Sequence, residues 1–293
     1  MHYRRLLCFV ALTGALSSTA ATAQVVDFGK YPNFSGQWSR PAGNPNNWRQ
    51  VAGPPPYTAE SEKKFAEIQA ISKQGSPANW PSTFCIPTGM PAMMNLYNPM
   101  EIVITPATTY VLMSHNNDQI RRIYTDGRSW PADGKYEPTY AGYSIGKWVD
   151  EDGDGKYDVL EVETRFLKDV RAYDVNGYPF ADDGKTVIKE RFFLDKSDPN
   201  TIYDEITVMD NALTRPYTKL MKALRTTDPR PNWFSEVCQE GNLWTKIGDE
   251  AYYLYQSRRQ ADAVEEGPAA PGPEIFQTTP EVNNNGQRLS PFR

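Results

Sequence analysis

The chain has 293 residues, of which 31 are basic and 36 are acidic, so its formal net charge is −5. An acidic protein of this kind is a poor partner for nucleic acid or an anionic membrane surface, and we expect neither. Its two histidines are too few for a histidine-rich zinc site or for catalysis that needs several imidazoles.

Residues 1–23 have the pattern of a secretory signal peptide, with Arg4 and Arg5 before a short apolar run and an Ala-x-Ala site at 21–23. The run is too short to span a bilayer, and no later stretch is long enough, so we expect no transmembrane segment. The mature chain would begin near Gln24 and be periplasmic or secreted. Its net charge would be −7, since two basic residues leave with the signal.

Residues 24–100 read as an irregular arm rich in proline, glycine and aromatic side chains. Within it, Thr58 is a helix cap, and the pattern predicts one helix over residues 58–72. Cys85, in this arm, and Cys238 are an even pair in an exported chain, which predicts a disulfide. Two separate buried thiols, or a reactive thiol at Cys85, are the alternatives.

From residue 101 to 261 the pattern changes to short segments of alternating polar and apolar residues, which predict antiparallel strands with one wet face. Many such strands must close into a barrel or stack as a sandwich to protect their edges. We expect a calycin-like β-barrel, with a β-sandwich as the alternative, and a disordered tail at 262–293. The predicted strands are 101–105, 109–114, 120–124, 144–149, 158–166, 186–194, 201–209, 217–225, 233–238 and 251–255.

An acidic loop lies between two of these strands and has the ligand spacing of a calcium-binding loop, with glycine at its sixth position. It predicts a structural Ca²⁺, while an ordinary acidic turn is the alternative, because Asp and Gly are common turn residues. No organic cofactor is expected. The predicted ligands are Asp150, Asp152, Asp154, the Lys156 carbonyl, Asp158 and Glu161.

Several segments resemble a largely uncharacterised family of exported, β-rich bacterial proteins of soil and sphingomonad-type bacteria. They include Cys-x-Pro-x-Gly-Met-Pro at 85–91, Arg-Arg-Ile-Tyr-Thr-Asp-Gly-Arg at 121–128 and Ala-Leu-Thr-Arg-Pro-x-Thr at 212–218. The resemblance implies the fold and the compartment more than a function. Two departures stand out: Tyr143 replaces a frequent histidine of the family, and the acidic loop is longer than the family's turn.

Alternation along residues 120–124 places one of two neighbouring arginines inside a barrel, where it would bind an anionic oxygen. We take Arg122 as this residue and, with Tyr124, Asp126 and Tyr143, as the candidate catalytic group, in which Tyr or Asp moves a proton. The alternative is a structural ion pair between Arg122 and an acid such as Glu101 or Glu163. The candidate substrate-binding residues are Arg215, Trp148 and Met90.

These residues predict a periplasmic, cofactor-free enzyme of the lyase or isomerase type that acts on a hydrophobic or aromatic small molecule held in the barrel. The alternative is a non-catalytic protein that binds such a molecule or a component of the cell envelope. The substrate, the reaction and the oligomeric state are open, a homodimer included.

Overall fold

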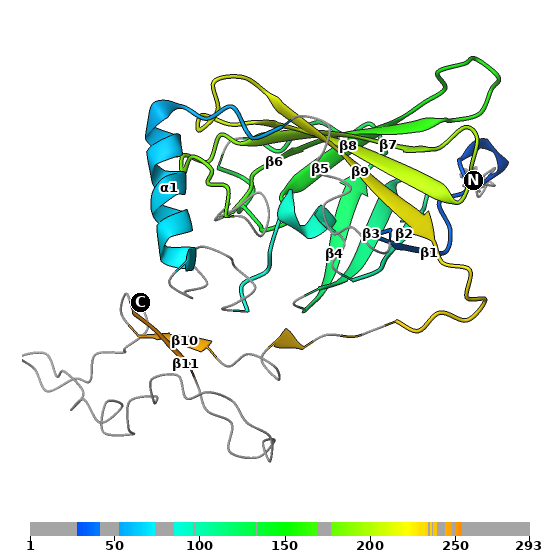
Figure 1. Ribbon diagram of the computed structural model, residues 1–293. Coiled ribbons are helices and arrows are strands. Elements are labelled where there is room, and N and C mark those ends of the chain that lie inside the picture. Colours follow the sequence, from blue (N-terminus) through cyan, green and yellow to red (C-terminus); the bar gives the residue numbers. More distant parts are fainter. Residues whose placement is uncertain are drawn as a thin grey trace, which may run out of the picture.

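A computed structural model describes residues 28–41, 53–73, 85–95, 98–115, 117–132, 134–168, 177–233, 235, 237–238, 244–247 and 250–253. Nine strands form a closed barrel in sequence order, and two further strands form a separate hairpin (Figure 1). The barrel strands are β1 (Gln37–Ser39), β2 (Met100–Ile104), β3 (Thr108–His115), β4 (Asn117–Tyr124), β5 (Tyr143–Val149), β6 (Val159–Arg165), β7 (Val187–Leu194), β8 (Thr201–Met209) and β9 (Tyr217–Arg225), and the hairpin is β10 (Trp244–Ile247) with β11 (Glu250–Tyr253).

The prediction of a mainly β fold with a barrel and one α-helix is confirmed within the described residues, and a barrel forms where a sandwich was the alternative. The predicted signal peptide and the predicted tail lie outside the described residues. One predicted strand is wrong: of residues 233–238, those that are described belong to no barrel strand. β10 was not expected from the sequence.

Alternating side chains build the barrel wall as the sequence predicts. In β8, Ile202, Asp204, Ile206 and Val208 are buried, while the residues between them are only half-buried. The register carries this alternation from strand to strand, because side chains that face each other across an antiparallel pair lie on the same side of the sheet. One of these inward residues, Asp204, is ionisable and lies in an otherwise apolar row.

The barrel is closed by a strand from the N-terminal arm. β1 pairs with β2 on one side and with β9 on the other. Trp38, in the middle of β1, is fully buried, and its indole nitrogen donates to the Phe34 carbonyl at 2.9 Å. The arm is therefore part of the barrel, and the expected boundary at residue 100 does not separate two structural units.

The single α-helix of the described residues, α1 (Ala59–Lys73), lies beside the barrel (Figure 1). Thr58 caps it as predicted: its hydroxyl accepts a hydrogen bond from the Ser61 amide at 3.2 Å. Phe65 packs on Tyr178 with ring centroids 4.8 Å apart, which attaches the helix to the rest of the molecule.

A methionine-rich segment fills the barrel interior. It ends in the 3₁₀ turn η3 (Ala92–Asn95), whose residues are all buried, and Met90, Met93 and Met94 belong to the hydrophobic core. Methionine is flexible and fits irregular spaces, which suits a segment that must pack against several strands at once.

The predicted disulfide is confirmed. Cys85 and Cys238 are bonded, with their Cα atoms 5.5 Å apart and a sequence separation of 153. The bond links Cys85, which precedes the methionine-rich segment, to the chain that follows β9. A link across so long a loop typically contributes about 2–5 kcal/mol.

Candidate functional site

One junction of the barrel differs in direction from the others, the one between β4 and β5, which we call the seam. These strands run parallel, in contrast to the antiparallel pairing predicted throughout, and they share only two register pairs, Ile123 with Ser144 and Tyr124 with Ile145. The part of β4 before Ile123 has no described strand on that side. A loop therefore takes the place of a strand next to it.

A hollow of about 310 Å³ opens at the seam on the outside of the barrel. Ligand sites in proteins are typically about 300–1,000 Å³, so this volume suits a small molecule. The walls of this seam hollow come from β4 and from the loop before β5. Its lining residues are Gln119, Ile120, Arg122, Tyr124, Tyr136, Thr139, Tyr140, Ala141, Gly142 and Tyr143.

Stacked aromatic rings form one side of the seam hollow. Tyr143 lies 4.9 Å from Tyr124 and 4.9 Å from Tyr136, measured between ring centroids, and the second pair meets edge to face. Trp130 and Phe166 continue the cluster at centroid distances of 5.6–6.4 Å. Such offset and edge contacts hold the rings in place without strong directional bonds.

Arg128 stabilises this cluster from its edge. Its guanidinium lies 3.8 Å above the Tyr124 ring and binds the Asp126 carboxylate, with Nη2 2.6 Å from Oδ2. The hydrogen bonds from Arg128 lower the pKa of Asp126 to about 2. Contacts with Asp126 first, and then with the Tyr143 hydroxyl, raise the pKa of Arg128.

Arg122 is the one cation in the wall of the seam hollow. Its side chain is exposed, and no described residue forms an ion pair or hydrogen bond with it. This Arg122 therefore offers a guanidinium fork that is available to an anionic ligand. No ion pair of Arg122 with Glu101 or Glu163 is present among the described residues, and Glu163 pairs with Arg165 and Lys189 instead.

A glycine allows the loop before β5 to approach the barrel so closely. Gly142 has a φ of +71°, and a Cβ placed on it would lie 2.6 Å from the Thr164 methyl and 2.8 Å from the Arg165 carbonyl. Phe166, at the end of β6, also has a positive φ and accepts a hydrogen bond from the Thr139 amide at 3.1 Å. The backbone of the seam is thus fixed by close contacts that only glycine permits at position 142.

The structure brings most of the predicted catalytic group together, but not where it was expected. Arg122, Tyr124 and Tyr143 line one hollow, while Asp126 lies beside it and holds Arg128. The expectation that Arg122 points into the barrel is wrong, because Arg121 is the inward arginine. Arg128 was missed, although its two-residue spacing from Asp126 was a readable signal.

The predicted substrate-binding residues do not meet. Arg215 is exposed in the turn before β9. Trp148 packs on Tyr31, with centroids 5.2 Å apart, away from the seam hollow. Met90 is buried in the core, and only its amide reaches the seam, where it donates to the Tyr140 carbonyl at 2.9 Å.

Inside the barrel, Arg121 is the centre of a polar cluster. It is 1% exposed and binds Glu190 of β7 with both terminal nitrogens, one of them 2.7 Å from Oε1. It also donates to Thr164 at 2.9 Å and to Ser144 at 3.3 Å, and so connects β4 to β5 and β6 across the seam. Arg121 is saturated by these partners and is not available to a ligand.

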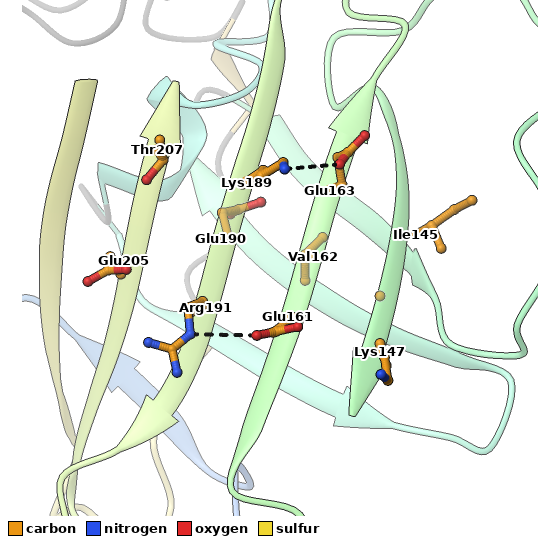
Figure 2. Close-up of a pocket in the computed structure, with 11 residues that line it drawn as sticks. Ile145, Lys147, Glu161, Val162, Glu163, Lys189, Glu190, Arg191, Glu205 and Thr207 are labelled. Carbon is orange, nitrogen blue, oxygen red and sulfur yellow. Dashed lines mark ion pairs between the residues drawn. The ribbon is translucent and has the colours of Figure 1, made fainter. Parts of the chain in front are cut away.

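On the outer face of β5–β8, basic side chains lie next to acidic ones, in contrast to Arg122 (Figure 2). In one row, Lys147, Glu161, Arg191 and Glu205 face one another in strand register and alternate in sign. In the next row, Lys189 pairs with Glu163 at 3.7 Å. A hollow of about 500 Å³ lies on this face, but its charges compensate one another.

A larger hollow of about 690 Å³ lies beside the acidic loop and also brings both signs of charge together. Arg191 pairs there with Glu151, and the Tyr203 hydroxyl donates to Asp195 at 3.2 Å. Neither of these two hollows is therefore as specific as the seam hollow.

The acidic loop gathers part of its predicted metal ligands. Asp150, Asp152 and Asp158 each place one carboxylate oxygen within 4.8 Å of the others. Glu161 instead points to Arg191 on the outer face, at 3.9 Å. The Asp154 carboxylate lies outside the group. The loop carboxylates also accept hydrogen bonds from the loop itself, for instance Asp150 from the Gly153 amide at 2.7 Å.

No protein-family model matches the chain, and no curated protein matches it. The family resemblance of the sequence therefore stays a prediction. Among the described residues, none of the helices has the length and apolar character needed to cross a membrane.

Proposed function

We propose that the protein binds a small aromatic molecule with an acidic group in the seam hollow. The observation that carries this proposal is the exposed guanidinium of Arg122, which has no partner among the described residues and lies in a wall of tyrosines. The rings would cover the aromatic part of the ligand, and Arg122 would bind its carboxylate or phenolate. A volume of about 310 Å³ suits a ligand with one ring.

A second candidate function is catalysis by the same site, as a cofactor-free lyase or isomerase. The ring stack that holds Tyr143 4.9 Å from Tyr124, whose face the Arg128 guanidinium covers at 3.8 Å, favours it. Arg122 would hold the anionic group, and Tyr143 would transfer a proton while Arg128 offsets the negative charge on its oxygen. Each of these residues then acts at a different point of the ligand.

We further propose that the protein works in the periplasm or outside the cell. The disulfide between Cys85 and Cys238 supports an oxidising compartment, and the leader pattern of residues 1–23 supports export. N-terminal sequencing of the protein from a periplasmic fraction should give a mature chain that begins near Gln24. A chain that keeps its first 23 residues and stays in the cytoplasm would contradict the proposal.

Binding is tested by calorimetry with benzoate and with neutral benzyl alcohol, which have the same ring. We expect benzoate to bind more tightly, and Arg122→Met to weaken benzoate by about tenfold or more, since a charge-assisted hydrogen bond contributes roughly 1.5–3 kcal/mol. Arg191→Met, which removes a paired arginine from the outer face of β5–β8, is the matched control and should leave binding unchanged. Equal benzoate affinity in wild type and Arg122→Met would rule out the anchor.

Turnover is tested by recovering the ligand and comparing it with the starting compound. If the site is catalytic, Tyr143→Phe keeps the ring stack and the binding but abolishes conversion. A compound that is bound and always released unchanged would leave the protein a carrier. The two candidate functions are thus separated by one pair of measurements on the same variant.

A further inference from the structure

Three ionisable side chains from three strands meet in the barrel core. Arg121 of β4 and Glu190 of β7 form the ion pair described above, and Asp204 of β8 is also 1% exposed. Glu190 faces Ile206 in the register of β7 and β8, so Asp204 is its diagonal neighbour on the inward face. Diagonal side chains on adjacent strands lie within reach of each other.

The charges of this cluster do not balance. Arg121 offsets one carboxylate, and both of its terminal nitrogens are directed at Glu190. Neither oxygen of Asp204 has a hydrogen-bond partner in the described part of the chain. A buried carboxylate without a donor is costly, whereas a protonated carboxyl can donate to a neighbouring carboxylate.

The other groups around Asp204 do not supply the missing charge. Its direct register neighbours are Phe192 of β7 and Met221 of β9, and both are apolar. Lys219 of β9 is buried too, but its ammonium lies over the rings of Tyr178 and Tyr217, at 5.5 and 5.4 Å.

The remaining neighbours of the cluster are polar without charge, or lie on the far side of the sheet. Ser144 and Thr164, from β5 and β6, are neutral, and the methionine-rich segment contributes Met94 at 3.7 Å from Arg121. Glu205, next to Asp204 in sequence, belongs to the outer charged row and adds further negative potential.

We propose that the barrel core is a proton-binding site, in which Asp204 and Glu190 share one proton that the folded protein holds at neutral pH. Burial first, and then the charge of Glu190, raise the pKa of Asp204 well above its ordinary value, while Arg121 opposes them. Folding therefore takes up a proton. This inference is independent of ligand binding at the seam.

The sign of the pH dependence follows from this uptake. Below the pKa of an unfolded aspartate, about 3.9, both states hold the proton and nothing changes. Above it the unfolded chain loses the proton first, so the ratio of folded to unfolded protein falls about tenfold for each pH unit. The fall ends at the raised pKa of Asp204 in the folded state. Stability is thus lost as the pH rises.

The experiment is urea unfolding of the full chain between pH 4.5 and 8.5, for wild type, Asp204→Asn and Asp182→Asn. Asparagine donates to Glu190 as the protonated aspartate does, without a proton to lose. We expect wild type to lose stability relative to Asp204→Asn by about tenfold per pH unit until the pH reaches the raised pKa of Asp204. Asp182 is exposed, and its variant should follow wild type.

Parallel profiles of wild type and Asp204→Asn would overturn the proposal. A second measurement does not need the variant to fold: the infrared carbonyl band of a protonated carboxyl should be present in native wild type at pH 7. Its absence would also overturn the proposal. If Asp204→Asn folds, it should lose the band, while Asp182→Asn keeps it.

Discussion

The β4–β5 seam and the wall formed by β6, β7 and β8 belong to one closed sheet but are held together in different ways. Antiparallel registers of six and eight residue pairs join the strands of the wall, and alternating charges cover its outer face (Figure 2). The seam has two parallel register pairs and depends on Arg121, which reaches across it from inside. A regular wall leaves its charges paired, whereas an interrupted one leaves room for a hollow and an unpaired arginine.

Three arginines show what this difference means for function. Arg191 on the wall lies among Glu151, Glu161 and other acids, and Arg121 in the core is saturated by Glu190. Only Arg122 lies in a concave surface without a described partner. The availability of a charge, more than its presence, distinguishes a binding surface from a solvated face or a structural ion pair.

The comparison is tested most strongly by removing the arginines of the core and of the wall. Arg121→Met leaves Glu190 buried without its cation and should lower the free energy of unfolding by about 3–5 kcal/mol. Arg191→Met removes exposed pairs and should cost no more than about 1 kcal/mol. Urea unfolding measures both.

The double variant Arg121→Met with Glu190→Gln separates the lost charge from the lost packing. Because it leaves no unpaired glutamate, it should recover part of the stability that Arg121→Met loses. Equal losses for the core and wall arginines would show that Arg121 does not hold the seam.

The next largest effect is expected at the glycine that closes the seam. Gly142→Ala combines a left-handed backbone with contacts of 2.6–2.8 Å at the new Cβ, and should cost roughly 2–4 kcal/mol. Gly155→Ala, in the loop at the end of β5, has a φ of +89° but open space around it, and should cost only about 1–2 kcal/mol. Similar losses at both sites, measured by thermal unfolding, would mean that close packing at the seam is unimportant.

The regular parts of the fold are readable from the sequence because local rules decide them. Alternation located the strands of the wall to within one or two residues, and Thr58 marked the start of α1. The parallel pairing of β4 and β5 is not readable, since it depends on where the chain between them returns to the sheet. A short strand at residues 34–39 could be expected from the sequence, but β1 is only three residues long, and its pattern does not show that it closes the barrel.

The sequence indicated most residues of the candidate site, but it placed them inside the barrel and not on its outer surface. Ile120, Arg122 and Tyr124 share one side of β4, and the sequence favours this side as the inward one. Ile120 is nevertheless 56% exposed. The better signal was elsewhere. Glu190 and Asp204 each interrupt an otherwise apolar inward row, and buried acids of this kind need an inward arginine, which β4 supplies as Arg121.

Calcium would act where the seam meets the wall, because the acidic loop connects β5 of the seam to β6 of the wall. If Asp150, Asp152 and Asp158 bind Ca²⁺ with a dissociation constant of about 0.1 mM, 1 mM calcium should raise stability by roughly 1.4 kcal/mol. Thermal unfolding with calcium and with a chelator measures the gain. It should be lost in Asp152→Asn and kept in Asp182→Asn. An equal gain in both variants would show that calcium acts elsewhere.

The smallest effect is expected from the ion pair at the rim of the seam hollow, where Asp126 holds Arg128 over the Tyr124 ring. The pKa of Asp126 is lowered to about 2, so the pair stabilises the fold at pH values above the ordinary aspartate range. That contribution is lost as the pH falls from about 4 towards 2. Because the carboxylate is exposed, salt should screen the pair and move the pKa back towards its ordinary value. Carbon NMR of the carboxyl group, at low and high salt, measures the shift. An ordinary pKa at low salt would show that Asp126 does not fix Arg128, and the ring stack alone would then have to position the rim of the seam.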